Sequence, residues 1–231
     1  MSIVSDIEKL KKEKNAVILA HYYVDEDVQD VADYIGDSFY LSKVATKVSQ
    51  DRIIFAGVEF MGESAKILNP KKRVFMPDMN ADCPMAHMAD KDEILALREK
   101  YNDLAVVCYI NSTAELKKYS DVCVTSSNAV KIVKNLPNKN IFFIPDRNLG
   151  SYVAKQCPDK NFIFNNGCCP RHVVITKDMV LKAKELHPEA RFAAHPECTE
   201  DVLALADYVG STSGIIDYVV DTDADEYIIG T

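Results

Sequence analysis

The stretch Ala32-Asp-Tyr-Ile-Gly-Asp-Ser38 occurs in three related copies along this sequence of 231 residues. The second copy is Ser120-Asp-Val-Cys-Val-Thr-Ser126, and the third is Ala206-Asp-Tyr-Val-Gly-Ser-Thr212. Successive aspartates lie 88 and 86 residues apart, and a hydroxyl residue follows each aspartate by five positions. A spacing that recurs in this way indicates repeated structural units, so we expect three related units of about 85 residues.

The same register extends outward from the three aspartates. A ring residue lies twelve positions before each aspartate, and a further polar residue lies two positions after that ring. The rings are His21, Tyr109 and His195, and the polar residues are Tyr23, Asn111 and Glu197. Each ring stands at the end of an apolar run, which is where open parallel sheets bind their ligands. We therefore expect the three sets to line one central site.

Short apolar runs rich in β-branched and aromatic residues alternate with helical patterns, which is typical of βαβ units. The expected fold class is α/β, with three pseudo-threefold related α/β domains whose short parallel sheets surround the central site. The domains are expected at residues 1–89, 90–175 and 176–231; the first begins with a helix over 5–14, and the third is incomplete. Strands are expected at 16–20, 53–56, 74–76, 105–110, 141–144, 162–164, 191–194 and 227–229.

The composition narrows the range of partners. With 35 acidic and 27 basic residues the net charge is -8, which disfavours capture of nucleic acid or of an anionic membrane surface. An anionic ligand must therefore be held by local groups. No apolar run approaches the roughly 20 residues of a membrane span, and the first residues lack the basic start and apolar stretch of a signal peptide. We expect a cytoplasmic protein.

The seven cysteines contain no pair with the CxxC spacing of a zinc ribbon. Extending the repeat register predicts one ligand cysteine per domain: Cys83 lies 50 residues after Asp33, and Cys169 lies 48 residues after Asp121, with Cys168 as its competitor. The third equivalent falls near position 256, beyond the sequence. Three thiolates related in this way suit an iron–sulfur cluster with one iron free of protein ligands, which could act as a Lewis acid. Of the remaining cysteines, Cys108 and Cys123 are expected to be small core residues, Cys157 to be incidental and Cys198 to be a buried structural thiol.

Eight motifs together resemble the quinolinate synthase family. They are His21-Tyr-Tyr23, Asp33-Tyr-Ile-Gly-Asp-Ser38, Phe60-Met-Gly-Glu-Ser-Ala-Lys-Ile-Leu-Asn-Pro70, Tyr109-Ile-Asn111, Thr125-Ser-Ser-Asn-Ala129, Gly167-x-Cys169-x-x-His172, His195-Pro-Glu-Cys198 and Gly210-Ser-Thr-Ser213. The resemblance implies a three-domain enzyme that condenses iminoaspartate (iminosuccinate) with dihydroxyacetone phosphate to quinolinate, the precursor of NAD. It also implies loss of phosphate and water, and a 4Fe-4S cluster held by one cysteine per domain.

The resemblance also implies residue roles. It implies Cys83 and Cys169 as cluster ligands, and Cys169 is preferred over Cys168 because the family spacing is Gly-x-Cys-x-x-His. The implied substrate contacts are His21, Ser38, Tyr109, Ile110, Asn111, Ser126, His195, Pro196, Glu197 and Thr212, with Tyr23, His172, Ser127 and Ser211 as further candidates. The implied catalytic acids and bases are His21, Tyr23, His195 and Glu197. The hydroxyls after each repeat would hold carboxylate and phosphate groups at helix N-termini.

Several alternatives stay open at this point. Ser38 and Ser126 could be only helix caps, and a histidine at a strand end is often structural. The chain could be an inactive substrate-binding or cluster-scaffold fragment that lacks the third ligand. It could also be another three-domain enzyme, such as one of the diphthamide-synthesis or terminal isoprenoid reductase families. As an enzyme it would be coupled to an L-aspartate oxidase or dehydrogenase that supplies iminoaspartate.

Overall fold

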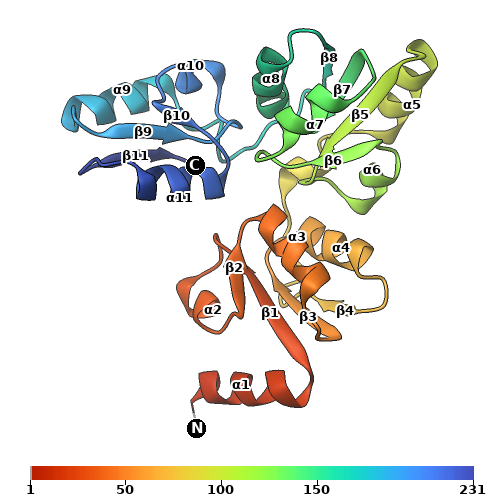
Figure 1. Ribbon diagram of the computed structural model, residues 1–231, viewed down its shortest axis with the longest axis vertical. Coiled ribbons are helices and arrows are strands. Elements are labelled where there is room, and N and C mark those ends of the chain that lie inside the picture. Colours follow the sequence, from red (N-terminus) through yellow and green to blue (C-terminus); the bar gives the residue numbers. More distant parts are fainter. Residues whose placement is uncertain (1) are drawn as a thin grey trace. The chain divides into compact units, whose positions relative to one another are not determined.

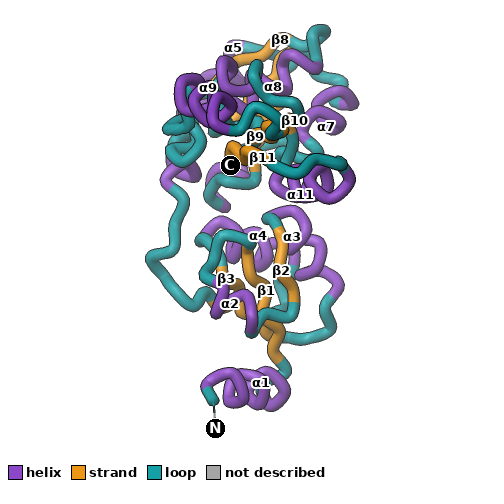
Figure 2. Tube along the Cα trace, turned by 90° about the vertical axis from the view of Figure 1, so that its left-hand side faces the viewer, coloured by secondary structure: helices purple, strands orange, loops and turns teal. Residues whose placement is uncertain are grey.

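The computed structural model describes residues 2–231. The chain divides into two compact units, one that ends at Cys83 and one that begins at Pro84. Figure 1 and Figure 2 show that each unit contains short strands flanked by helices. No helix within residues 2–231 combines the length and the apolar character that crossing a membrane requires.

The first unit contains one four-stranded parallel sheet with the strand order β2-β1-β3-β4. Its elements are α1 (Ile3–Glu13), β1 (Ala16–His21), α2 (Glu26–Asp30), β2 (Tyr34–Gly36), α3 (Ser38–Lys47), β3 (Arg52–Ala56), α4 (Glu59–Leu68) and β4 (Arg73–Phe75). The central strand β1 is buried along its whole length. Its core includes Leu19, Leu41 and Phe55, which are fully buried.

The second unit contains two parallel sheets, with the orders β6-β5-β7-β8 and β10-β9-β11. A 3-10 turn (Pro84–His87) opens it, and its elements are α5 (Lys91–Lys100), β5 (Leu104–Tyr109), α6 (Ala114–Lys118), β6 (Val122–Val124), α7 (Ala129–Asn135), β7 (Asn140–Ile144), α8 (Arg147–Gln156), β8 (Asn161–Phe164), α9 (Lys177–Leu186), β9 (Arg191–Ala194), α10 (Glu200–Leu203), β10 (Tyr208–Val209), α11 (Thr212–Asp221) and β11 (Tyr227–Gly230). In every sheet the central strand ends at a ring residue or directly before it. This strand lies between the strand of the repeated stretch and the next strand along the chain.

The aspartate of each repeated stretch joins an edge strand to the central strand of its sheet. Its carboxylate accepts a hydrogen bond from the backbone N–H of the residue fifteen positions earlier, at 2.7 to 2.8 Å. Its own N–H donates to the carbonyl oxygen of the same residue. The three pairs are Asp33 with Ile18, Asp121 with Val106 and Asp207 with Phe192. The repeated aspartate is therefore a structural residue, which explains why its spacing recurs.

A basic side chain from the helix before each central strand pairs with the same aspartate. Lys11 lies 2.9 Å from Asp33, and Arg98 lies 2.9 Å from Asp121. In the third sheet the corresponding contact, from Lys184, is 3.6 Å long. Charge-assisted hydrogen bonds of this kind fix the start of each sheet relative to the helix that covers it.

The structure confirms the α/β class and the short parallel sheets. All eight expected strands are present, with ends that differ by a residue or two, and β2, β6 and β10 are additional edge strands of two or three residues. The first helix begins at Ile3 and is capped by Ser2, so the expected start at residue 5 was wrong. The domain boundaries at 89/90 and 175/176 stay a prediction.

Candidate active site

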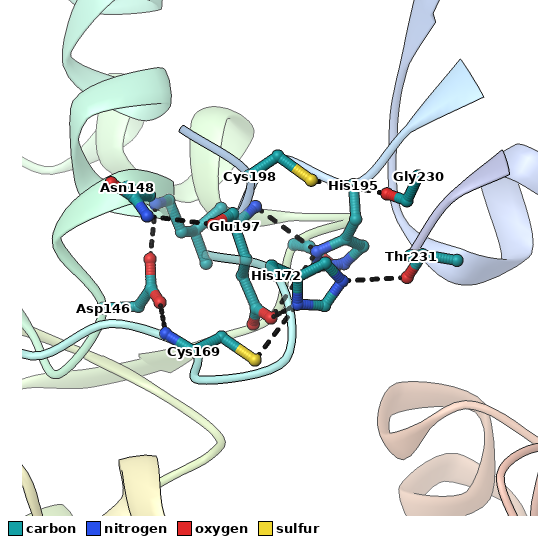
Figure 3. A network of polar contacts seen from close by, with 11 residues as sticks. Asp146, Asn148, Cys169, His172, His195, Glu197, Cys198, Gly230 and Thr231 are labelled. Carbon is teal, nitrogen blue, oxygen red and sulfur yellow. Dashed lines mark hydrogen bonds and ion pairs between the residues drawn. The ribbon is translucent and has the colours of Figure 1, made fainter. Parts of the chain in front are cut away.

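A cluster of buried polar side chains lies within the second unit, where loops after β8 and β9 meet (Figure 3). Nδ1 of His172 lies 2.8 Å from Oε2 of Glu197 and 3.0 Å from Sγ of Cys169. Nδ1 of His195 lies 3.7 Å from the same carboxylate oxygen, and its ring stacks on that of His172 with centroids 4.8 Å apart. Each of the four side chains is less than a tenth exposed. Four groups that can exchange protons or bind metal therefore share one small space.

Three of these side chains form a donor set for a metal. The ligand atoms of Cys169, His172 and Glu197 all lie within 4.8 Å of one another. Among the described residues, Oε1 of Glu197 is buried and has no hydrogen-bond partner. Thiolate, imidazole and carboxylate are the usual protein ligands of transition metals. A buried carboxylate oxygen without a partner is costly, and a cation would satisfy it.

Burial and the neighbouring charges shift the ionisation of this cluster. Burial raises the pKa of the Cys169 thiol to about 12, and the Glu197 carboxylate adds to the increase. Burial opposes ionisation of Glu197 as well, but the hydrogen bond from His172 and the nearby imidazoles hold the pKa of this carboxyl below its usual range. Burial and the Glu197 charge raise the pKa of the Tyr109 hydroxyl. Glu197 is thus the anionic centre, and Cys169 becomes a thiolate readily only when a cation stabilises it.

The N-terminus of α8, directly after β7, positions both sides of the cluster. Asp146 is completely buried, and its carboxylate accepts hydrogen bonds from the N–H of Leu149 at 2.6 Å and of Cys169 at 2.8 Å. Two residues later, Asn148 donates from its side chain to the backbone carbonyl of Glu197 at 3.0 Å (Figure 3). The sequence analysis missed these two residues. A polar Pro-Asp-Arg-Asn loop directly after a buried strand could have indicated them.

Histidines at two strand ends adopt the same local geometry. Nδ1 of His21, after β1, accepts a hydrogen bond from the N–H of Tyr23 at 3.2 Å, and Nδ1 of His195, after β9, accepts one from the N–H of Glu197 at 3.4 Å. In the neutral ring this leaves the proton on Nε2. Nε2 of His195 lies 3.2 Å from Oγ of Ser126. The second unit therefore brings together a ring and a hydroxyl from two of the repeats.

In the first unit the predicted residues His21 and Tyr23 are in contact, with ring centroids 4.8 Å apart. His21 is buried, and burial lowers its pKa to about 4, although the Asp37 carboxylate acts in the opposite direction. Ser38 is the first residue of α3, and Asp37 is the cap, accepting from the N–H of Tyr40 at 2.8 Å. The cap interpretation of Ser38 is therefore wrong. Cys83 is partly exposed and is the last residue of this unit.

The remaining predicted residues lie at strand ends or helix starts of the second unit. Tyr109 ends β5 and is buried, and Ile110 continues the sheet with a hydrogen bond to the carbonyl of Val124. Thr212 begins α11 and is preceded by its cap, Ser211. The other predicted positions follow β5, β6 or β9: Asn111, Ser126, Ser127 and Pro196. Cys168 is partly exposed, whereas Cys169 is buried and adjoins the polar cluster.

The fold and this cluster define an α/β enzyme with a candidate metal centre at the carboxyl ends of parallel strands. The family model described as quinolinate synthetase A protein matches residues 5–231. A quinolinate synthase of Fusobacterium nucleatum is 61% identical over 225 residues, which are 97% of this chain and 75% of the relative. Those of Caldicellulosiruptor saccharolyticus and Clostridium perfringens are 54% and 50% identical, and the matches cover 76% and 77% of these relatives.

The chain belongs to the quinolinate synthase family. The resemblance found in the sequence is confirmed, and the chain does not belong to either of the two alternative three-domain families. The match covers about three quarters of each relative's length. All the motifs that carried the resemblance lie inside the matched region of this chain.

Proposed function

We propose that the chain catalyses the quinolinate synthase reaction of NAD biosynthesis, in which iminoaspartate and dihydroxyacetone phosphate condense to quinolinate with loss of phosphate and water. The observation that supports this most directly is the buried cluster of Cys169, His172 and Glu197 beside His195, in a chain of this family. Condensation and dehydration require groups that hold and move protons near the reacting carbons. Two imidazoles next to one carboxylate supply such groups.

Cys83 and Cys169 are the proposed ligands of a 4Fe-4S cluster. The surroundings of Cys169 fit such a group, because its thiol is buried and Glu197 presents a carboxylate oxygen without a partner among the described residues. When bound, a cluster with one iron free of protein ligands supplies Lewis-acid chemistry toward a substrate oxygen. Asp146 holds the backbone N–H of Cys169 and so orients the thiol.

The protein's own residues have distinct proposed roles. Glu197 is the proposed base, and His172, hydrogen-bonded to it, is the residue that shares its proton. His195 and Ser126 form one binding pair, in which Nε2–H of His195 donates to the Ser126 hydroxyl and that hydroxyl donates to a substrate oxygen. Because these side chains are buried, the interactions of the Glu197 carboxylate with the two imidazoles are stronger than they would be in water.

Anionic substrate groups are proposed to bind at helix N-termini. Ser38 begins α3 and Thr212 begins α11, each a ten-residue helix whose first backbone N–H groups and dipole favour an anion. A preceding residue supplies the cap in both helices, Asp37 in one and Ser211 in the other. The remaining predicted contacts, Tyr23, Tyr109, Ile110, Asn111 and Pro196, are proposed as substrate contacts. Supply of iminoaspartate by an L-aspartate oxidase or dehydrogenase, and a cytoplasmic location, are also part of the proposal.

The adjacent cysteines provide a test with a matched control. After anaerobic reconstitution with iron and sulfide, Cys169→Ser should lose most of the bound iron and sulfide, whereas Cys168→Ser should retain them. Quinolinate formation from iminoaspartate and dihydroxyacetone phosphate should follow the same order. Loss of the cluster in Cys168→Ser alone would transfer the ligand role to that residue. A native chain that binds the cluster and forms no quinolinate would instead support the scaffold alternative.

A further inference from the structure

Two cysteines outside the candidate active site lie side by side in the larger sheet of the second unit. Cys108 on β5 and Cys123 on β6 are direct partners in the parallel register. Side chains at paired positions of a sheet point to the same face. Their sulfur atoms therefore project from adjacent strands on one face of the sheet. They are therefore a pair rather than two isolated cysteines.

The two thiols differ in access to solvent. Cys108 is completely buried and packs in a core cluster with Ile94, Leu116 and Phe142. Cys123 is exposed, because β6 is the edge strand of this sheet. The expectation that both are core residues was therefore correct only for Cys108. A small reagent can reach Cys123, and through it the buried partner.

The surroundings of the pair favour a thiolate on Cys108, whereas the interaction with Cys108 raises the pKa of Cys123, which therefore holds the shared proton. The hydrogen bond with Cys123 is the largest cause that lowers the pKa of Cys108, to about 7, against burial, which acts to raise it. The hydroxyls of Ser112 and Ser120 and the Lys117 ammonium add to the decrease. Oγ of Ser112 is buried and has no hydrogen-bond partner among the described residues. A thiolate is the species that attacks a disulfide.

We propose that Cys108 and Cys123 form a reversible disulfide when the protein meets a small-molecule disulfide such as oxidised glutathione. Strands that pair in a sheet lie about 4.8 Å apart, and disulfides join residues whose Cα atoms are roughly 4.4 to 6.8 Å apart. The backbone therefore needs no large movement to form this bond. The proposal does not depend on the quinolinate synthase reaction.

The exchange proceeds in two balanced steps. Cys123 transfers its proton to the Cys108 thiolate as its sulfur attacks one sulfur of oxidised glutathione, which forms a mixed disulfide and releases one glutathione thiolate. After that proton passes to the released glutathione, the Cys108 thiolate attacks Sγ of Cys123, which forms the protein disulfide and releases the second glutathione thiolate. The two protons of the protein thiols go to the two glutathiones. Two protein thiols are thus oxidised and one oxidised glutathione is reduced.

The sequence makes this bond easy to detect. Cleavage after lysine and arginine places Cys108 in the peptide 101–117 and Cys123 in the peptide 119–131, and each peptide contains a single cysteine. The full chain is reduced, treated with oxidised glutathione while folded, alkylated with N-ethylmaleimide, digested and analysed by mass spectrometry. The expected result is a linked pair of these peptides, with parallel loss of both alkylated forms and full recovery after dithiothreitol.

Two variants complete the experiment. Cys123→Ser, at an exposed position, should abolish the linked pair and leave Cys108 reduced. Cys157→Ser, which removes a buried cysteine at the end of α8, should leave the yield of the link unchanged. A stable glutathione adduct on Cys123 with Cys108 still alkylated would overturn the proposal. So would a link that forms only after the chain is unfolded in urea, as followed by circular dichroism.

Discussion

The ends of β1 and β9 share one backbone geometry and differ in chemistry. In each, a buried histidine accepts through Nδ1 the N–H of the residue two positions later. After β1 that residue is Tyr23, which is 64% exposed, and after β9 it is Glu197, which is 3% exposed. The repeat therefore determines where the two histidines stand, and the next polar residue determines what their surroundings can do.

The electrostatic consequences differ in the same way. Burial lowers the pKa of His21 to about 4, so this ring is neutral at pH 7. At the end of β9, burial disfavours the charge of Glu197, but hydrogen bonding to His172 lowers the pKa of the carboxyl and keeps it ionised. The buried His21 ring, next to the exposed Tyr23, is thus a neutral hydrogen-bonding group. A buried carboxylate between two rings is a site that can take up and release a proton.

Among the tests of this difference, Glu197→Gln has the largest expected effect. The amide keeps the size of the side chain and cannot act as a base, so quinolinate turnover should fall by about 10² to 10⁴-fold. Tyr23→Phe, at the equivalent position after β1, should have a smaller effect because that side chain is largely exposed. Iron and sulfide content, measured in parallel, should be unchanged in Tyr23→Phe, and turnover is expressed per bound cluster so that any loss of metal in Glu197→Gln is separated from loss of the base. Full turnover of Glu197→Gln with an intact cluster would remove Glu197 from the mechanism.

The neutral state of His21 predicts a pH dependence of stability. Its pKa is about 4 in the folded chain against a usual value of 6.5, so the unfolded chain binds the extra proton between these values and stability decreases as the pH falls. From pH 7 to pH 5 this contribution amounts to about 2 kcal/mol. Urea unfolding at both pH values should show it in the native chain and in Tyr23→Phe. His21→Gln should lose it, and an unchanged pH dependence in that variant would contradict the assignment.

Asp33 and Asp207 should contribute comparable amounts to the free energy of unfolding, Asp33 in the sheet of the first unit and Asp207 in the three-stranded sheet of the second. Asp33→Ala and Asp207→Ala each remove a charge-assisted hydrogen bond to a central strand, with an expected loss of about 1 to 2 kcal/mol. Asp33→Ala should be the more costly, because its partner Lys11 is buried. The free energy of unfolding in urea measures both. Asp6→Ala, in the first turn of α1, is the surface control, and equal losses in all three variants would argue against the structural role.

The smallest expected effect concerns the first turn of α8. Asn148→Ala removes the hydrogen bond to the carbonyl of Glu197 and should reduce turnover a few-fold, with a loss of about 1 kcal/mol or less in stability. The matched control is Arg147→Ala, because that side chain is exposed and one position away. If both variants kept native turnover and the same pH profile, Asn148 would have no positioning role.

Much of the site could be located from the sequence because the repeat is a local property. The alternation of apolar runs, the recurring aspartate and the ring twelve positions before it fixed the central strands and the edge at which the polar residues gather. The edge strands β2, β6 and β10 were not predicted, although β4, which is equally short, was: strands of two or three residues carry few positions on which to show an alternation, and these three lie within the polar repeated stretch. The caps of α1 and α3 lie one or more residues before the predicted positions, because the exact end of a helix is hard to assign.

The sequence by itself determined that three related sets of parallel strands are present, and which side chains stand at their strand ends. Only the tertiary structure decided the partners of those side chains. The structure placed His172 against Glu197, fixed Cys169 through Asp146 and exposed Cys123 beside the buried Cys108. These relations join segments that are distant in the chain, and burial and ionisation follow from how such segments pack. Local pattern determines position along a strand, whereas packing determines charge and reactivity.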